Sequence, residues 1–187
     1  MVSDFAPIRT ERLTLRRFAA RDAVAFQAYR DDPDVARWQS WTGCSLGQAE
    51  AFVAEQAAAA YDERGSWFQV AIAGRADDRL IGDIGLHVLA EDARLVEIGL
   101  SLAPAAQGRG LATEALDALI RHLFRDRGKH RLHASIDPRN PRSFGLFERL
   151  GFRREAHFRR HAWVKGAWCD DYVYALLAED WMGRDAA

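Results

Sequence analysis

The chain turns at Gln107-Gly108-Arg109-Gly110-Leu111-Ala112, a short stretch between two periodic segments of different kinds. Before it, residues 95–102 carry apolar side chains at every second position, which is typical of a strand. After it, apolar residues recur every three or four positions from 111 to 124, which predicts one face of a helix. Pro104 suits the exit of the strand. The sequence therefore predicts a strand that leads through a glycine turn into a long helix.

The glycines of this turn also suit a ligand. Glycine adopts backbone conformations that other residues avoid, and it lets a ligand approach the main chain closely. The first N–H groups of the following helix lack partners within the helix and carry the positive end of its dipole, so they bind anions without a lysine. A P-loop is excluded because no Gly-Lys-Ser/Thr follows, and the dinucleotide-binding Gly-x-Gly-x-x-Gly spacing is incomplete. By itself, such a turn is more often structural than ligand-binding.

Further elements extend from this turn in both directions. Asp22 and Ser45 stand where helix N-caps belong, and Gly65 and Gly151 stand where two helices should stop. The expected strands cover residues 10–18, 67–73, 79–88, 95–102, 131–136, 152–164 and 168–177. The expected helices cover residues 21–30, 45–64, 111–124 and 140–150. This order predicts an α/β or α+β sheet of mixed direction with helices on both faces, in a single domain over residues 1–187.

The composition limits the classes of function. The 187 residues are 49% hydrophobic and carry a formal net charge of −1, so a packed core is expected and direct nucleic-acid binding is not. No apolar run is long enough for a membrane span, and the N-terminus lacks the pattern of a signal peptide. Cys44 and Cys169 form no metal motif and are interpreted as free thiols, so no metal is expected. These features predict a cytoplasmic protein with soluble partners and no membrane contact.

Taken together, these segments resemble the GNAT superfamily of N-acetyltransferases and, within it, the RimJ/RimL-like group. Gln107, Gly110 and Ala112 match the superfamily's Gln-x-x-Gly-x-Ala pyrophosphate motif. The other matching stretches are the opening strand at 10–16, the strand at 96–104, the second coenzyme motif at 140–143 with 150–152, and the closing strand at 170–177. Each motif alone is weak, whereas the ordered set, spanning residues 8 to 178, is specific.

The resemblance implies a fold and a coenzyme site. The GNAT fold is a mixed, mostly antiparallel sheet of about seven strands, which a bulge splays between strands 4 and 5. Acetyl-CoA is then the co-substrate, and its pantetheine arm runs along the backbone of Leu100, Ser101 and Leu102. Asn140 is expected to bond the pantetheine amides, with helix capping as its structural alternative, and Phe147 is expected to pack against the coenzyme. The pyrophosphate is expected on Gln107, Gly108, Arg109, Gly110, Leu111, Ala112 and Thr113.

The resemblance also implies that an amine attacks the thioester carbonyl directly. Glu97 is the leading candidate for the base or for a group that positions a water, with a salt-bridged strand carboxylate as the structural alternative. Asp83 on the neighbouring strand is a rival base, although a hydrogen-bonded acid is the more common role. His87 and His133 are expected to be packed or exposed, while catalysis stays open because histidine titrates near neutral pH.

The group that protonates the leaving thiolate is left open by the sequence. Many relatives place a tyrosine on the helix after the asparagine motif, but this chain has Phe147 at the matching position. Ser143 is the candidate donor near the sulfur, with hydrogen bonding at the helix N-terminus as the alternative. A non-catalytic acyl-CoA-binding module therefore stands beside the enzyme as a second hypothesis.

The acceptor amine is not named by the sequence. Trp38 and Trp41 lie where this family builds its acceptor pocket, and aromatic rings hold cationic amines, although packing in the core is an equal alternative. The basic stretch at 153–161 could meet an acidic partner or the 3′-phosphate of the coenzyme, with an ordinary exposed strand as the alternative. A protein N-terminus or a small amine is the expected acceptor. Because relatives often pair, a homodimer is a further expectation.

Overall fold

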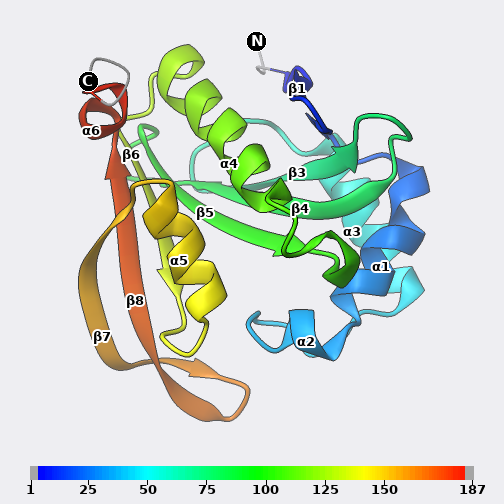
Figure 1. Ribbon diagram of the computed structural model, residues 1–187. Coiled ribbons are helices and arrows are strands. Elements are labelled where there is room, and N and C mark those ends of the chain that lie inside the picture. The colour runs from blue at the N-terminus through cyan, green and yellow to red at the C-terminus, as the bar shows by residue number, and fades with distance from the viewer. Residues whose placement is uncertain (1–3, 184–187) are drawn as a thin grey trace.

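The computed structural model describes residues 4–183, which build one eight-stranded sheet (Figure 1). The strands are β1 (Ile8–Arg9), β2 (Leu13–Arg16), β3 (Trp67–Gly74), β4 (Leu80–Val88), β5 (Leu95–Leu102), β6 (Arg131–Ile136), β7 (Arg153–Val164) and β8 (Ala167–Leu177). They lie in the order β1-β2-β3-β4-β5-β6-β8-β7, and only β5 and β6 pair in parallel. The predicted mixed, mostly antiparallel sheet is confirmed. It has eight strands rather than about seven because the short β1 pairs with β2 at the edge.

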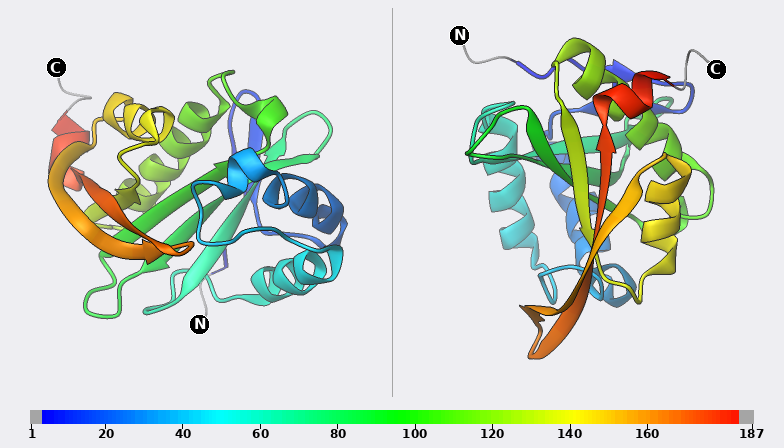
Figure 2. Two further views of the ribbon diagram at one scale, coloured as in Figure 1. Left: turned by 90° about the horizontal axis from the view of Figure 1, so that it is seen from below. Right: turned by 90° about the vertical axis from the view of Figure 1, so that its left-hand side faces the viewer.

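Helices cover both faces of this sheet, as predicted. They are α1 (Ala23–Arg30), α2 (Pro33–Ala36), α3 (Leu46–Ala58), α4 (Leu111–Arg121), α5 (Pro141–Arg149) and α6 (Ala178–Met182). α1 and α3 pack on one face, and α4 and α5 pack on the other (Figure 2). Each face has its own cluster of buried apolar side chains, and the larger one lies under α4 and α5.

α3 begins at the predicted residue but ends earlier than predicted. Ser45 is its N-cap, as predicted: the Ser45 hydroxyl accepts from the N–H of Gln48, and the Gln48 side chain accepts from the N–H of Ser45 at 2.8 Å. The helix ends at Ala58, well before the predicted end at residue 64. The chain has already turned at Asp62, whose φ of 67° is left-handed. Gly65 therefore does not stop the helix, and its N–H bonds a β4 carbonyl at 2.8 Å.

Asp22 stands at the predicted N-cap position of α1, but its side chain does not cap that helix. α1 begins at Ala23 after a short 3₁₀ turn, and the Asp22 side chain bonds no N–H of α1. Its buried carboxylate instead accepts two hydrogen bonds from the Arg16 guanidinium, at 2.7 and 2.9 Å, and one from the N–H of Ala19 at 2.8 Å. A bidentate, charge-assisted pair of this kind is among the strongest polar contacts in proteins. Asp22 therefore ties β2 to the start of α1.

The two helices of the coenzyme motifs begin where the sequence places them. α4 starts at Leu111 and continues past Arg121 as a wider π-helical turn to Asp126. The Asn140 carboxamide caps α5, because its Oδ1 accepts from the N–H of Ser143 at 3.2 Å. Gly151 follows the end of α5 with a φ of 87°, which confirms it as the glycine that ends this helix.

Candidate coenzyme and acceptor site

A gap between β5 and β6 is the central feature of the site. Their parallel pairing begins at Leu95 and Arg131 and ends at Glu97 and His133, although β5 runs on to Leu102. The two strands diverge beyond this point (Figure 1). Because β1 is an extra strand, β5 and β6 are the predicted strands 4 and 5, and the predicted splay is confirmed. The bulge expected to cause it is not found, since β5 pairs with β4 from Val96 to Leu102 without a shift of register. Residues 98–102 of β5 have no strand partner on this edge.

The register of β4 and β5 shows which backbone groups face the gap. The N–H of Ala103 donates to the carbonyl of Ile81 at 2.9 Å, and hydrogen-bonded pairs alternate along an antiparallel ladder. Ser101 therefore directs its N–H and carbonyl toward β4, which removes it from the predicted pantetheine-binding backbone. The even-numbered residues, including Leu100 and Leu102, direct theirs into the gap.

Two glutamine side chains bond the carbonyls on this open edge. Gln107 Nε2 donates to the carbonyl of Leu102 at 3.0 Å. Gln39 Nε2, from the loop after α2, donates to the carbonyl of Leu100 at 3.4 Å. Sequence reasoning missed Gln39, because nothing in its local pattern indicates a contact with β5. The β5 edge can therefore bond amide donors, which is the chemistry that a pantetheine arm presents.

The glycine turn lies at the end of this edge. Gly108 and Gly110 have left-handed backbones, with φ of 72° and 75°, which other residues adopt less readily. A Cβ at Gly108 would meet no atom within 4 Å, so the turn is open to an approaching group. Gly110 is the N-cap of α4, and the N–H groups of Leu111 and Ala112 begin that helix. The geometry fits an anion at the helix start, as a pyrophosphate requires.

The turn between β1 and β2 braces this glycine turn; the strand expected over residues 10–18 is confined to β2, Leu13–Arg16. Arg12 donates from Nε to Glu114 in the first turn of α4 at 2.6 Å, and from Nη1 to the carbonyl of Arg109 at 3.0 Å. Thr10 donates its hydroxyl to the same glutamate at 2.6 Å. Burial alone would raise the pKa of Glu114, but the hydrogen bonds from Thr10 and Arg12 lower it below its usual value. The carboxylate is therefore charged, and it holds the helix start in place.

α5 contributes less to the gap than the sequence suggested. Asn140 uses its side-chain oxygen to cap the helix, which is its structural alternative. Phe147 is 3% exposed and packs edge-on against Phe152 at 5.0 Å, so it lies in the core with little surface for a coenzyme. Ser143 is partly exposed in the first turn of α5. Phe147, which stands where many relatives are expected to have a tyrosine, is therefore a core residue in this protein.

Four polar or aromatic side chains cross the sheet in a single row at the closed end of the gap, where β5 and β6 are last paired. Trp67 lies opposite His87, His87 opposite Glu97, and Glu97 opposite His133. The Trp67 and His87 rings stack at 4.9 Å, and His87 Nδ1 lies 3.7 Å from a Glu97 carboxylate oxygen. Burial lowers the pKa of His133, while the nearby Glu97 carboxylate acts in the opposite direction. Glu97 therefore sits at the vertex of the splay, between two imidazoles rather than beside an arginine.

Asp83 is an anchor for α1. Its buried carboxylate accepts from the Tyr29 hydroxyl at 2.6 Å and from the Arg30 guanidinium at 2.9 Å. Burial raises the pKa of Asp83, against the opposing effects of Arg30 and Tyr29. Trp41 completes this cluster, since its Nε1 donates to the Arg30 carbonyl at 3.0 Å and its ring stacks on the Arg30 guanidinium at 3.7 Å. These contacts support the packing alternatives for Asp83 and Trp41, while Trp38 lies near the guanidinium of Arg37 at 4.7 Å.

The β7–β8 hairpin extends beyond the body of the sheet (Figure 2). The basic stretch at 153–161 lies on β7, where most side chains are exposed, and some are paired with acids. Lys165 at the hairpin turn donates to the carbonyl of Ala36 in α2. Beside it, the rings of Trp163 and Trp168 meet at 5.4 Å and are largely exposed. The hairpin tip therefore lies next to the loop that carries Gln39.

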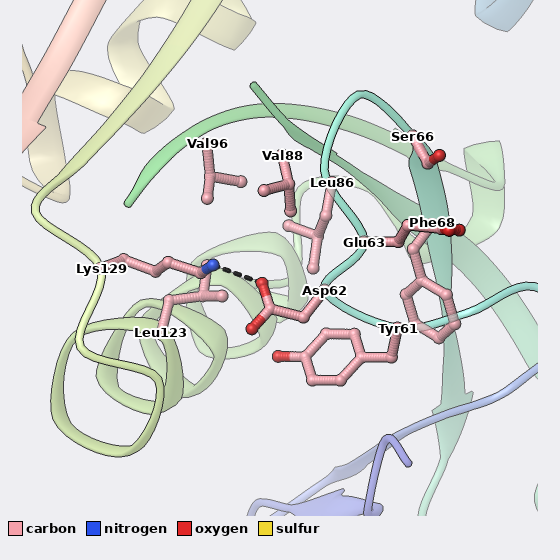
Figure 3. Close-up of a pocket in the computed structure, with 10 residues that line it drawn as sticks. All are labelled: Tyr61, Asp62, Glu63, Ser66, Phe68, Leu86, Val88, Val96, Leu123 and Lys129. Carbon is pink, nitrogen blue, oxygen red and sulfur yellow. Dashed lines mark hydrogen bonds and ion pairs between the residues drawn. The ribbon is translucent and has the colours of Figure 1, made fainter. Parts of the chain in front are cut away.

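A separate pocket lies beside the paired end of β5 and contributes no reactive group (Figure 3). Its only lysine, Lys129, is 4% exposed and bonds both the Asp62 carboxylate and the carbonyl of Ala93. Asp62 also accepts from Arg127 at 2.6 Å. These ion pairs fix the turn after α3 against the core, so the pocket is structural.

The splayed sheet, its open β5 edge and the anion-binding helix start together define an acyltransferase of the GNAT type. Residues 12–153 match the family model described as the acetyltransferase (GNAT) domain, and the chain belongs to this family. YnaD of Bacillus subtilis strain 168, an uncharacterized N-acetyltransferase, is 30% identical over 174 residues, which cover 93% of this chain and 98% of YnaD. Family membership makes this protein an acetyltransferase.

Two further comparisons relate the chain to the RimJ-like group. The ribosomal protein uS5-alanine N-acetyltransferase of Escherichia coli K12 is 39% identical over 84 residues, which cover 45% of this chain and 43% of that enzyme. RimJ of Mycobacterium smegmatis, solved in complex with CoA-disulfide, has a TM-score of 0.79 at 27% identity and covers 94% of this chain and 87% of its own. The resemblance to this group is thereby confirmed.

Two negative observations apply to residues 4–183. No helix in this range is long and apolar enough to cross a membrane. The same residues hold no group of three or more His, Cys, Asp or Glu side chains that could bind a metal ion.

Proposed function

We propose that this protein transfers the acetyl group of acetyl-CoA to a primary amine by direct attack within a ternary complex. The observation that carries the proposal is the open β5 edge, whose Leu100 and Leu102 carbonyls face the gap and already bond amide donors. A pantetheine arm adds to such an edge as an extra strand does. The pyrophosphate then meets the N–H groups at the start of α4.

The reaction needs few side chains. The amine nitrogen forms a bond to the thioester carbon, and the carbon–sulfur bond breaks to release the thiolate. The N–H of Leu100 faces the gap and would polarise the carbonyl. Glu97 takes the proton that the amine loses, and the Ser143 hydroxyl donates to the departing sulfur. Alignment of the two substrates supplies most of the acceleration, on the order of 7–11 kcal/mol.

The acceptor in this proposal is a protein N-terminus or a small amine. The relative that acetylates an alanine of ribosomal protein uS5 supports the first option. The loop that carries Trp38 and Gln39, the hairpin tip at Lys165 and the row that contains Glu97 would surround the amine. Trp41 is engaged by Arg30, so Trp38 is the better candidate of the two tryptophans for contact with substrate. We propose that the whole of residues 1–187 serves as one such domain in the cytoplasm, with a homodimer as the expected assembly.

Release of free thiol from acetyl-CoA tests this proposal. The acceptors are peptides with N-terminal alanine or serine, a polyamine and an aminoglycoside, and the matched control is each peptide with its N-terminus already acetylated. We expect thiol release with at least one free amine and none with the blocked peptides. Binding of acetyl-CoA by calorimetry without thiol release from any acceptor would instead favour a non-catalytic acyl-CoA-binding module.

A further inference from the structure

The row Trp67–His87–Glu97–His133 stands at the last strand pair before the gap opens. Four neighbouring strands place these side chains on one face of the sheet, the face opposite α4 and α5, because direct partners in a sheet share a face. Glu97 is the acid of the row and has an imidazole on each side. A carboxylate that only needed a salt bridge would be served by an arginine or a lysine, which do not titrate near neutral pH.

Glu97 and His87 both reach water. The side chain of His87 is 26% exposed and that of Glu97 is 29% exposed, and Trp67, on which His87 stacks, is 44% exposed. Burial lowers the pKa of His133, so desolvation disfavours a proton on that ring. Of the two imidazoles beside Glu97, His87 is therefore the better candidate to carry a proton from the carboxylate to solvent.

We propose that His87 is a positioning residue that receives, through Glu97, the proton of the acceptor amine and passes it to solvent. This inference rests on the proposed function. In the first step, the ammonium group of the acceptor gives a proton to the Glu97 carboxylate and becomes a neutral amine. In the second, a side-chain rotation closes the 3.7 Å between the two groups to hydrogen-bond distance, and the carboxylic acid gives this proton to the His87 ring, which becomes an imidazolium. In the third, the imidazolium releases the proton to water, and both side chains return to their starting states.

Other charged groups lie near this row and shift the pKa values of its neighbours. Asp171 on β8 faces Glu97, and burial raises the pKa of Asp171 even though Ser135 and the backbone of Ile136 hydrogen-bond its carboxylate. Arg131 on β6 lowers the pKa of His133 and Glu155 on β7 raises it, and these two side chains pair with each other. His161 on β7 lowers the pKa of Asp171. None of these groups lies between His87 and Glu97, whose ring and carboxylate are separated by 3.7 Å.

The kinetic test replaces the ring that carries the proton but keeps the stack. His87→Phe retains an aromatic ring on Trp67 and cannot titrate. We expect kcat to fall by roughly tenfold or more, with the KM for acetyl-CoA unchanged, and we expect added imidazole to restore part of the rate. The matched control is His157→Phe, which removes another histidine that pairs with an acid, Asp170, but lies on β7 outside the row. That variant should keep the wild-type rate.

The pH profile separates a relay from a packing role. If His87 carries the proton, the limb of the kcat profile between about pH 5 and 7.5 should flatten in His87→Phe, because that limb reports an imidazole. If His87 only packs, the variant should lose thermal stability and keep a profile parallel to that of the wild type. A parallel profile together with no response to imidazole would overturn the relay, while thiol release by the wild type would leave the proposed function intact.

A second measurement does not depend on turnover. The ring signals of His87 are followed by NMR from pH 8 to 5 in the wild type and in Glu97→Gln. A proton shared between the two side chains requires that their titrations be coupled, so the two His87 curves should differ. Superimposed curves would show that Glu97 and His87 do not exchange a proton, and they would refute the relay whatever the activity.

Discussion

On the proposed coenzyme side of the gap, the groups expected to face a ligand belong to the backbone of residues 98–113. On the proposed acceptor side, they are side chains from the loop after α2, the row across β3–β6 and the tip of the β7–β8 hairpin. The first side is one continuous stretch of chain. The second is assembled from segments that lie far apart in the sequence.

This difference has a physical basis. A pantetheine arm and a pyrophosphate are recognised by amide geometry, which glycines and an unpaired strand edge provide whatever the side chains are. An acceptor amine is recognised by charge, shape and aromatic surface, which only side chains provide. The coenzyme side should therefore tolerate changes of side chain and fail when backbone geometry changes. The acceptor side should respond to single side chains.

The largest effect should come from the anchor beneath the acceptor side. Asp83→Ala removes the acceptor of two hydrogen bonds and leaves the Arg30 guanidinium, 9% exposed, without its counter-charge. Removing one partner of a buried pair costs about 3–5 kcal/mol. We expect a loss of this size in the free energy of unfolding, measured by urea denaturation. The folded fraction should keep its kcat, because Asp83 holds α1 and does not reach the gap.

The matched control removes the whole buried network. Tyr29→Phe, Arg30→Met and Asp83→Leu together leave no orphaned polar group, and apolar replacements of similar volume are often close to neutral. The triple variant should recover most of the stability lost by Asp83→Ala. If Asp83→Ala were as stable as the wild type, or if it lost activity while folded, Asp83 would become the base to test in place of Glu97.

The next effect should come from Glu97 itself. Glu97→Gln keeps the shape and hydrogen bonding of the side chain but removes its basicity. Amines are mostly protonated near pH 7, so kcat should fall by about 10²-fold while coenzyme binding survives. The residual rate should rise with pH, because solvent then supplies more of the free amine. Measurements of kcat/KM against pH, with thermal melts as the stability control, check this; parallel profiles would remove Glu97 from the mechanism.

The contrast between the two sides also explains what the sequence predicted. Alternation in residues 95–102 and the glycine turn located β5 and α4, because each is a local pattern with a local cause. Ser45 and Gly151 were read correctly for the same reason. The splay was predicted from the resemblance to the GNAT family. Asp22 was placed correctly at the start of α1, but its carboxylate binds the Arg16 guanidinium instead of capping the helix, because Arg16 comes close in space. The turn after α3 likewise contains Asp62, whose ion pairs with distant Arg127 and Lys129 no local pattern could reveal.

The residues of the proposed acceptor side could not be brought together from local sequence patterns. The row at Glu97 needs the register of four strands, and register follows from pairing that a single sequence does not display. Gln39 reaches Leu100 across a long separation in the chain, and Arg12 reaches Glu114 in the same way. Phe147 could be placed on α5 but not on its buried face, since helix rotation is set by packing. Roles of Ser143 and Trp38 stay predictions for experiment.

On the coenzyme side, a change in the turn should act through charge. Gly110→Asp places a carboxylate at the start of α4, and its Cβ meets only an Arg12 nitrogen at 3.5 Å, so the chain should fold. Aspartate tolerates a left-handed backbone better than most residues. Repulsion of the pyrophosphate should weaken coenzyme A binding by at least about tenfold in calorimetry. Gly110→Asn, with the same shape and no charge, is the control; equal affinities of the two variants would show that no anion sits here.

The smallest effect should come from a contact that joins the two sides, the bond from Gln39 to β5. Gln39 belongs to the acceptor loop, yet its Nε2 donates at 3.4 Å to the Leu100 carbonyl, a group that the pantetheine arm would bond. A single neutral hydrogen bond contributes about 0.5–1.5 kcal/mol, and at 3.4 Å the lower end applies. Gln39→Ala should therefore remove a competitor and tighten coenzyme A binding by roughly two- to threefold in calorimetry. The KM for the acceptor should rise, because the loop loses its hydrogen bond to β5.

Gln107→Ala is the contrasting variant. The Gln107 side chain donates to the Leu102 carbonyl at 3.0 Å, but Gln107 belongs to the coenzyme turn, so its loss should weaken coenzyme binding. If both variants changed coenzyme affinity in the same direction, the two glutamines would serve one side of the gap, and the division between backbone and side-chain recognition would not pass between them.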